Sequence, residues 1–309
     1  MPEYECYRLS IGLKSPLGTP WQADTVIGHL AWMVAFNEGV KGVEEFLAPF
    51  MTGDPPFIIS DGFPGGLLPR PLGVKHTTGI NDLAAYGRER SKRKAEFLKI
   101  ADFEKARRGK EIEGEPLPSP WEEFETLHAT ISRNSNTTTD EAGNLFSTGS
   151  WVIKGEDQDD VVSTINVYSY GLKSWREKIE RLFQQLSMVG FGRDKSVGAG
   201  QFNLLKMEEW KGFGSFDGAN GFIALSSFVP AEDDPVNGKW ALNIKYGKLG
   251  ENVDYGNPFK RPFLQIKPGA TFYTEGPPKA FYGRVLKDLA PGFPEAVQIC
   301  YTLAVPCKI

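Results

Sequence analysis

The chain has 309 residues, 40% of them hydrophobic and 12% aromatic, which is enough for two domains with substantial cores. A formal net charge of −4 argues against attraction of the whole surface to a polyanion, and the three cysteines and three scattered histidines form no metal-ligand pattern, so no metal or cofactor is expected. The 34 glycines and 22 prolines exclude an all-helical bundle and predict a mixed α and β fold with many turns.

The N-terminal elements are predicted to be a strand, a turn and a helix. Apolar residues alternate with polar ones or glycine over residues 7–13, as in a strand with one buried face. Residues 16–20 break this pattern, and Asp24 is positioned to cap a helix whose apolar surface runs from Val26 to Val34. The apolar run 26–36 is too short to cross a bilayer, and no secretory signal precedes it, so we expect a cytoplasmic protein without membrane contact.

The next stretch is first rich in proline and then basic. Residues 53–73 hold five prolines and five glycines and are predicted to be irregular. From Arg88 to Lys110, ten lysines and arginines stand against four acids. Residues 92–108 are predicted to be helical, with Phe97 among the inward anchors. Such a segment either contacts nucleic acid or is a solvated helix face.

A polar insertion follows between two strand-like pieces. Residues 127–131 alternate in polarity, residues 151–153 are apolar, and residues 133–144 between them are polar. We predict an extended hairpin or finger here. A further strand is predicted over residues 161–170.

A predicted helix then leads into a glycine-rich loop. Residues 174–177 have a capping-box pattern, and the apolar residues from Ile179 to Val189 fall on one helix face, so this helix is predicted to end at Gly190. A short strand over residues 201–207 follows the loop. A Walker loop has the opposite order, with the strand before it and the helix after it, so that motif is excluded.

The loop itself, residues 190–200, is the strongest functional signal. Its four glycines allow close approach of the backbone to a ligand, and Arg193, Lys195 and Ser196 supply donors for phosphates. If it binds a phosphate chain, bulkier residues at Gly198 and Gly200 are expected to weaken binding without unfolding the protein. The alternative is an ordinary glycine-rich connection.

The second half of the chain is predicted to be mostly sheet. A domain boundary near residues 210–220 is followed by short strands separated by glycine and proline. These strands are expected over residues 221–228, 240–246, 263–267, 271–273 and 296–305.

Taken in order, five parts of the chain resemble the RAMP superfamily of CRISPR proteins, and within it the Cas5-like subunit of type III-A (Csm) effector complexes. They are residues 19–33, 59–64 with 68–71, 131–134 with 145–146, 190–202, and 225–230 with 246–248. The resemblance implies an α+β fold of two ferredoxin-like (RRM-like βαββαβ) domains, residues 1–212 and 213–309, the first with an inserted thumb hairpin and the glycine-rich loop.

The resemblance also implies a function without catalysis. Such a subunit holds the repeat-derived 5′ tag of a CRISPR RNA and docks the large polymerase-type subunit and the backbone RAMP subunits in antiviral defence. It assigns RNA binding to the loop residues Gly190, Gly192, Arg193, Lys195, Ser196, Gly198 and Gly200. The thumb, close to the target RNA, would contribute Arg133, Asn134 and Phe146, with Phe146 as a wedge between bases and Arg133 as a phosphate partner.

Each of these roles has an alternative. Phe146 is also expected as a packing residue at the base of the hairpin, and Arg133 as the ion-pair partner of Asp140 or Glu141. A rival function is a metal-independent endoribonuclease that processes CRISPR precursor RNA, with His29 as general base. A phosphate-binding small-molecule enzyme is a third possibility, but the sequence offers it no evident base, nucleophile or metal set.

Overall fold

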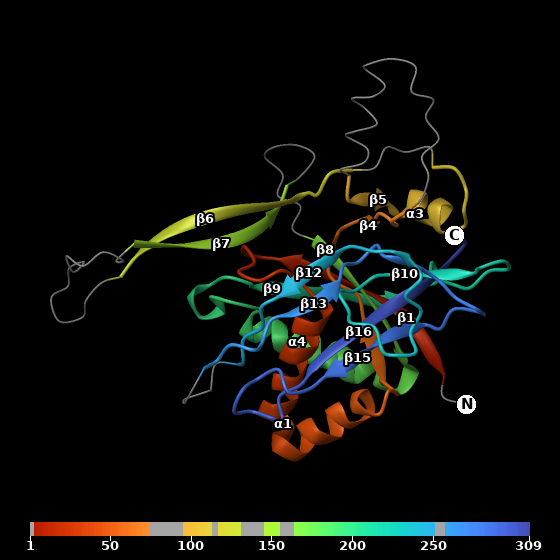
Figure 1. Ribbon diagram of the computed structural model, residues 1–309. Helices are drawn as coiled ribbons and strands as arrows, with labels where there is room; N and C mark the ends of the chain where they lie inside the picture. The colour runs from red at the N-terminus through yellow and green to blue at the C-terminus, as the bar shows by residue number, and fades with distance from the viewer. Residues whose placement is uncertain (1–2, 74–94, 113–116, 131–144, 155–163, 251–256) are drawn as a thin grey trace.

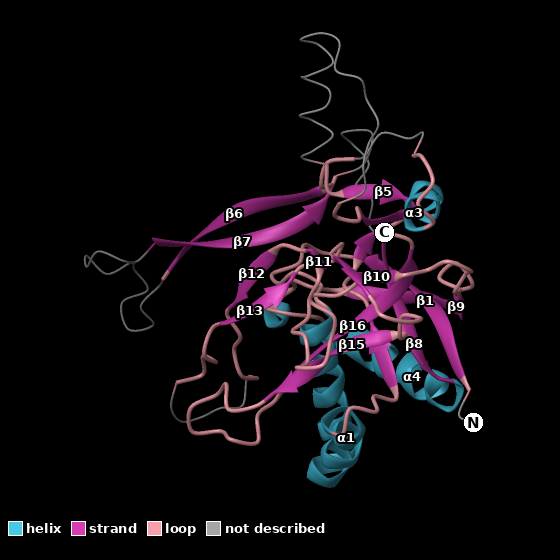
Figure 2. Cartoon of the chain, turned by 45° about the vertical axis from the view of Figure 1, so that its right-hand side comes forward, coloured by secondary structure: helices cyan, strands magenta, loops and turns pink. Residues whose placement is uncertain are grey.

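The computed structural model describes residues 3–73, 95–112, 117–130, 145–154, 164–250 and 257–309. Two antiparallel sheets form the body, helices α1 and α4 pack against each other, and α1 reaches the bottom of both views in Figures 1 and 2. A two-stranded hairpin, β6–β7, extends away from this body. The mixed α and β composition predicted from the sequence is confirmed.

The first sheet is built from the N-terminal two thirds of the chain. Its strands lie in the order β2-β8-β1-β9, every neighbouring pair is antiparallel, and β3 also pairs with β8. The helices α1 and α4 connect strands within it, so the chain runs strand, helix, strand, strand, helix, strand. The elements are β1 (Tyr4–Leu13), α1 (Ala23–Met51), β2 (Phe57–Ile59), β3 (Phe63–Pro64), β8 (Thr164–Leu172), α4 (Arg176–Val189) and β9 (Phe202–Glu209).

The start of α1 differs from the sequence prediction. Asp24 does not cap the helix but lies buried in its first turn. The carboxylate of Asp61 takes the capping position instead, because its Oδ1 accepts a hydrogen bond from the Ala23 amide at 2.8 Å. The helical backbone is also interrupted at Gly39, whose φ of 70° is readily adopted by glycine.

The proline-rich and basic segments hold more strand than predicted. Residues 53–73 contain β2, β3 and β4 (Leu67–Pro69) rather than irregular chain alone. The predicted helix 92–108 is wrong at Phe97, which lies in β5 (Phe97–Lys99) and pairs with Pro69. Among the described residues 95–108, the helical ones are those of α3 (Ile100–Arg107), and residues 74–94 lie outside the described part.

One member of the basic segment is a structural residue. The Arg107 side chain is buried, and its guanidinium donates to the carbonyls of Gly212 at 3.0 Å, Gly214 at 3.0 Å and Pro306 at 3.2 Å. The Glu104 carboxylate, at 2.8 Å, balances its charge. Arg107 therefore binds the two ends of the C-terminal part and does not face a nucleic acid.

The predicted hairpin is present. β6 (Trp121–Ala129) pairs with β7 (Leu145–Ile153) in an unbroken antiparallel register from Trp121↔Ile153 to Ala129↔Leu145. β6 begins nearer the body, and β7 begins nearer the outer end of the hairpin, than the sequence pattern indicated, because most of their side chains are exposed and give little hydrophobic periodicity. Residues 131–144, which include Arg133, Asn134, Asp140 and Glu141, lie outside the described residues.

The second sheet comes from the C-terminal part, in the order β11-β14-β10-β16-β15. A separate ribbon, β12–β13, packs beside it. The strands are β10 (Gly221–Ala224), β11 (Gly238–Lys239), β12 (Leu242–Lys245), β13 (Phe263–Ile266), β14 (Thr271–Tyr273), β15 (Phe281–Leu286) and β16 (Gln298–Cys307). The described residues of 213–309 contain no helix, so a second βαββαβ unit is not confirmed there.

The two halves share one hydrophobic core. Ile223, Leu225 and Leu303 belong to the same buried cluster as Phe46 and Phe50 of α1. The described residues include no helix able to span a membrane and no group of three His, Cys, Asp or Glu residues able to hold a metal ion.

Candidate nucleic-acid interface

The glycine-rich loop begins where the sequence predicts. α4 ends at Gly190, whose φ is 87° and whose amide donates to the Leu186 carbonyl at 2.9 Å. The predicted capping box is wrong, because no side chain caps α4 and Ser174 lies in the 3-10 turn Lys173–Trp175. Phe191 then turns fully inward and stacks against Trp21, with ring centroids 4.3 Å apart. The helix end and this buried ring fix where the loop starts.

Hydrogen bonds close the loop and attach it to the segment before α1. The Phe191 amide donates to the Gly200 carbonyl at 2.9 Å, and the Gly200 amide donates to the Pro16 carbonyl at 2.8 Å. The Arg193 amide donates to Oγ1 of Thr19 at 3.0 Å. Gly18 lies so close that a Cβ there would be 2.5 Å from the Arg193 carbonyl oxygen. The loop is thus held in one conformation by hydrogen bonds and is not a flexible linker.

Most of the loop amides are therefore occupied inside the protein. The amides of residues 190–193 and 197–200 all donate to protein acceptors. The amides of Asp194 and Ser196 have no such acceptor among the described residues. The sequence interpretation, in which amides from Gly190 to Gly200 hold phosphates, is thereby narrowed to the tip of the loop.

The tip presents the polar side chains that the sequence analysis selected. Arg193 and Ser196 are exposed, and Lys195 is half-buried in the 3-10 turn Lys195–Val197. The Arg193 guanidinium donates to the Gly149 carbonyl of β7 and lies 3.1 Å from the Asp194 carboxylate. Arg193 therefore links the loop to the hairpin, a contact that no sequence pattern indicated.

Phe146 lies near the outer end of the described hairpin. Its ring is 48% exposed and stacks on His128 of β6, with centroids 5.2 Å apart and planes at 18°. Nε2 of His128 lies 2.8 Å from Oγ1 of Thr148, which fixes the orientation of the imidazole. Phe146 is thus placed away from the base of the hairpin, and His128 is a neighbour that the sequence analysis did not select.

His29 connects α1 to the loop. Its Nε2 accepts a hydrogen bond from the Gly192 amide at 3.3 Å, and its ring lies 5.0 Å from that of Phe191. Burial, with a smaller contribution from the Lys195 charge, lowers the pKa of His29 to about 4. The imidazole is neutral near pH 7, and its acceptor nitrogen is already used by the backbone.

The variant His29→Gln tests this environment, because glutamine keeps a hydrogen-bond acceptor for the Gly192 amide but does not titrate. The stability of the wild-type protein relative to this variant should therefore depend on pH. Because the folded pKa of His29 lies below the unfolded value, only the unfolded chain takes up this proton as the pH falls from 7 to 4.5. We expect the wild-type protein to lose about 2 kcal/mol of unfolding free energy relative to the variant over this range. Urea denaturation of both proteins at the two pH values measures it, and a constant difference would contradict the prediction.

No protein-family model and no curated protein matches the chain. Solved structures do match it. A chain of the Csm1–Csm4 cassette in complex with pppApA is 17% identical, with a TM-score of 0.62 over 99% of both chains. The same cassette in complex with cA4 gives a TM-score of 0.63 at 17% identity, over 98% of both chains.

A chain of the Csm3–Csm4 subcomplex of the type III-A CRISPR-Cas interference complex is 10% identical, with a TM-score of 0.59 over 99% of this chain and 100% of that one. Csm4 is the component common to these assemblies. At such low sequence identity, the similarity shows the fold alone. The chain therefore has, over nearly its whole length, the fold of a Csm4-type chain, which confirms at the level of the fold the resemblance inferred from its sequence.

Proposed function

We propose that the chain is a CRISPR RNA-binding subunit of a type III-A effector complex, with no catalytic role of its own. The observation that carries this proposal is the match over 99% of both chains to a chain of the Csm1–Csm4 cassette. In this role the chain holds the 5′ tag of the RNA and contacts the large subunit and the backbone subunits. Its first sheet is a ferredoxin-like unit with the β6–β7 hairpin as the thumb, close to the target RNA.

The loop and the hairpin provide two kinds of contact for one RNA strand. Arg193, Lys195 and Ser196 at the loop tip are donors suited to phosphates. Phe146 and His128 provide a ring surface on which an unpaired base stacks, at about 1–3 kcal/mol per base. Arg193 bonds β7 at Gly149, three residues from Phe146, or about 10 Å along the strand. A single RNA strand can therefore contact the loop tip and the rings of Phe146 and His128 at the same time.

The environment of His29 supports a role without catalysis. A general base needs an accessible nitrogen with a pKa near the working pH. Here burial holds the pKa of His29 at about 4, and Nε2 accepts the Gly192 amide. We infer that His29 orders the loop. Metal-free cleavage of a repeat RNA by the wild-type protein, abolished in His29→Ala, would instead support the endoribonuclease alternative.

The proposal predicts how RNA affinity depends on salt. Replacing Lys195 or Arg193 by glutamine is expected to weaken binding of a single-stranded RNA that carries the 5′ tag. Each lost phosphate contact should reduce the slope of log affinity against log salt concentration by about 0.7. Fluorescence anisotropy over a series of salt concentrations measures this slope.

Lys41→Gln is the matched control for this experiment, because Lys41 is exposed on α1 and pairs with Glu45 at 3.7 Å. It changes the net charge by the same amount and should leave the slope unchanged. If all three variants keep the wild-type slope, the tip of the loop does not bind RNA.

A further inference from the structure

The β12–β13 ribbon has its polar face inside and its apolar face outside. The register pairs Asn243 with Gln265 and Ile244 with Leu264. Since side chains alternate across a strand, Asn243, Lys245 and Gln265 share one face with Phe263. Leu242, Ile244 and Leu264 share the other face with Ile266, which is buried where the ribbon meets the second sheet. A ribbon on a protein surface normally has the opposite arrangement, with its apolar side chains directed inward.

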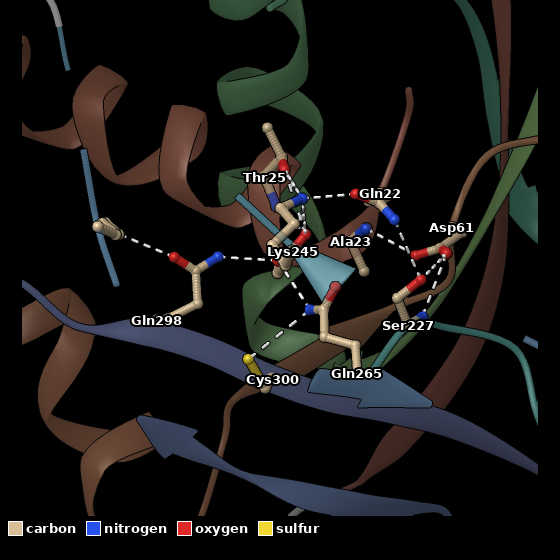
Figure 3. A network of polar contacts seen from close by, with 11 residues as sticks. Gln22, Ala23, Thr25, Asp61, Ser227, Lys245, Gln265, Gln298 and Cys300 are labelled. Carbon is tan, nitrogen blue, oxygen red and sulfur yellow. Dashed lines mark hydrogen bonds and ion pairs between the residues drawn. The ribbon is translucent and has the colours of Figure 1, made fainter. Parts of the chain in front are cut away.

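The inward face is held by a buried carboxylate. Oδ1 of Asp24 accepts a hydrogen bond from Nζ of Lys245 at 3.1 Å, and Oδ2 accepts from Nε2 of Gln265 at 3.0 Å. Gln298 of β16 donates to Oδ2 as well, at 2.8 Å. Figure 3 shows these side chains converging from β12, β13 and β16. A shift of register by one residue would break the bonds of Lys245 and Gln265 to Asp24, so Leu242, Ile244 and Leu264 stay directed outward.

The outward face is an exposed apolar surface with a hollow in it. Leu242, Ile244 and Leu264 are 44%, 53% and 55% exposed. Leu242 and Leu264 line a pocket of about 200 Å³ together with Val236 and Trp240. Contiguous apolar surface of this kind marks a site of contact with another molecule.

The chemistry of this face favours a polypeptide over RNA. Its outward positions on β12 and β13 contain no lysine or arginine to meet phosphates. Glu232 and Asp233 are exposed in the short segment that joins the pocket residues Pro230 and Val236. An apolar side chain in the pocket, with lysine or arginine beside it, would satisfy both features. A second copy of this chain docking through the same face would bring the same carboxylates to the interface.

We propose that the outer face of β12–β13 is the docking site for a neighbouring protein subunit, which inserts an apolar side chain between Trp240, Leu242 and Leu264 and places basic residues against Glu232 and Asp233. This inference rests on the proposed function, because it takes the partner to be a protein of the same effector complex. The ribbon is a preformed surface, since its orientation is set from within by Asp24.

The test uses the full chain with the large subunit and the backbone subunits of its effector complex. The variants are Leu242→Ser with Leu264→Ser, and Glu232→Lys with Asp233→Lys. Val40→Ser, which removes an exposed apolar side chain on α1, is the control. Affinity for each subunit is measured by titration, tagged-RNA binding by anisotropy, and folding by thermal denaturation.

We expect the apolar variant to weaken binding of one subunit by a hundredfold or more and the charge variant by about tenfold, with the melting temperature and RNA binding kept. Normal subunit binding by the folded variants would overturn the proposal. The proposal would also be overturned if the variants lost only self-association, which would identify a second copy as the occupant. Loss of RNA binding alone would overturn it as well. If the wild-type chain binds the subunit through this face but binds no tagged RNA, the proposed function fails while the docking site stands.

Discussion

Asp24→Ala is expected to lower the free energy of unfolding by about 3–5 kcal/mol, because it leaves a buried ammonium without its counter-charge. The Asp24 side chain is 1% exposed and lies 3.1 Å from Nζ of Lys245. The amides of Gln265 and Gln298 lose their acceptor at the same time. Each unsatisfied buried donor adds its own desolvation cost.

Urea denaturation at constant pH measures this effect. The control is Glu45→Ala, which removes an exposed ion pair with Lys41 and should change stability by no more than about 0.5 kcal/mol. The double variant Asp24→Ala with Lys245→Met should regain part of the loss, since it removes the unpaired charge. A cost below 1 kcal/mol for Asp24→Ala would contradict the buried network.

Gly200→Ala is expected to have an effect of similar size, about 3–5 kcal/mol. A Cβ at this position would lie 1.9 Å from the Phe191 carbonyl oxygen, and the φ of Gly200 is +65°. The obstructing atom is backbone, and Phe191 itself is held in the core, so nothing can move aside cheaply. The closure of the loop between Phe191 and Gly200 would open.

Gly198→Ala is the matched control within the same loop. Its φ is +102°, but no atom lies within 4 Å of the added Cβ, so only the backbone strain of about 1–2 kcal/mol remains. The same denaturation series separates the two variants, and equal costs would contradict this account of the loop. The sequence alone gave both glycines the same expectation, that bulkier residues leave the fold intact, and the geometry restricts that expectation to Gly198.

Local patterns in the sequence identified the elements around the loop well. The apolar face of α4 and the glycine that ends it were predicted because their signals lie within one helix. The first strand was likewise predicted, since Leu9 and Ile11 alternate with polar neighbours. Arg193 and Ser196 are exposed in the loop between α4 and β9, although which amides remain available was not foreseen.

The errors arise where the partner of a residue is distant in sequence. Asp24 is a good capping residue by type, but Asp61, 38 residues from Ala23, occupies that position. Arg107 looked like part of a basic surface, yet its acceptors include carbonyls 105 and 199 residues away. The sequence predicted a strand over residues 240–246 but not which face of β12 is buried, because that depends on Asp24.

The distribution of these long-range partners has a consequence for synthesis of the chain. Asp24, near the start of the chain, finds its long-range donors on Lys245, Gln265 and Gln298, which leave the ribosome late. A nascent chain that ends before β12 lacks Lys245, Gln265 and Gln298, so the Asp24 carboxylate has neither its counter-charge nor its two amide donors. We therefore expect the first sheet to reach its final packing only after almost the whole polypeptide has been synthesised.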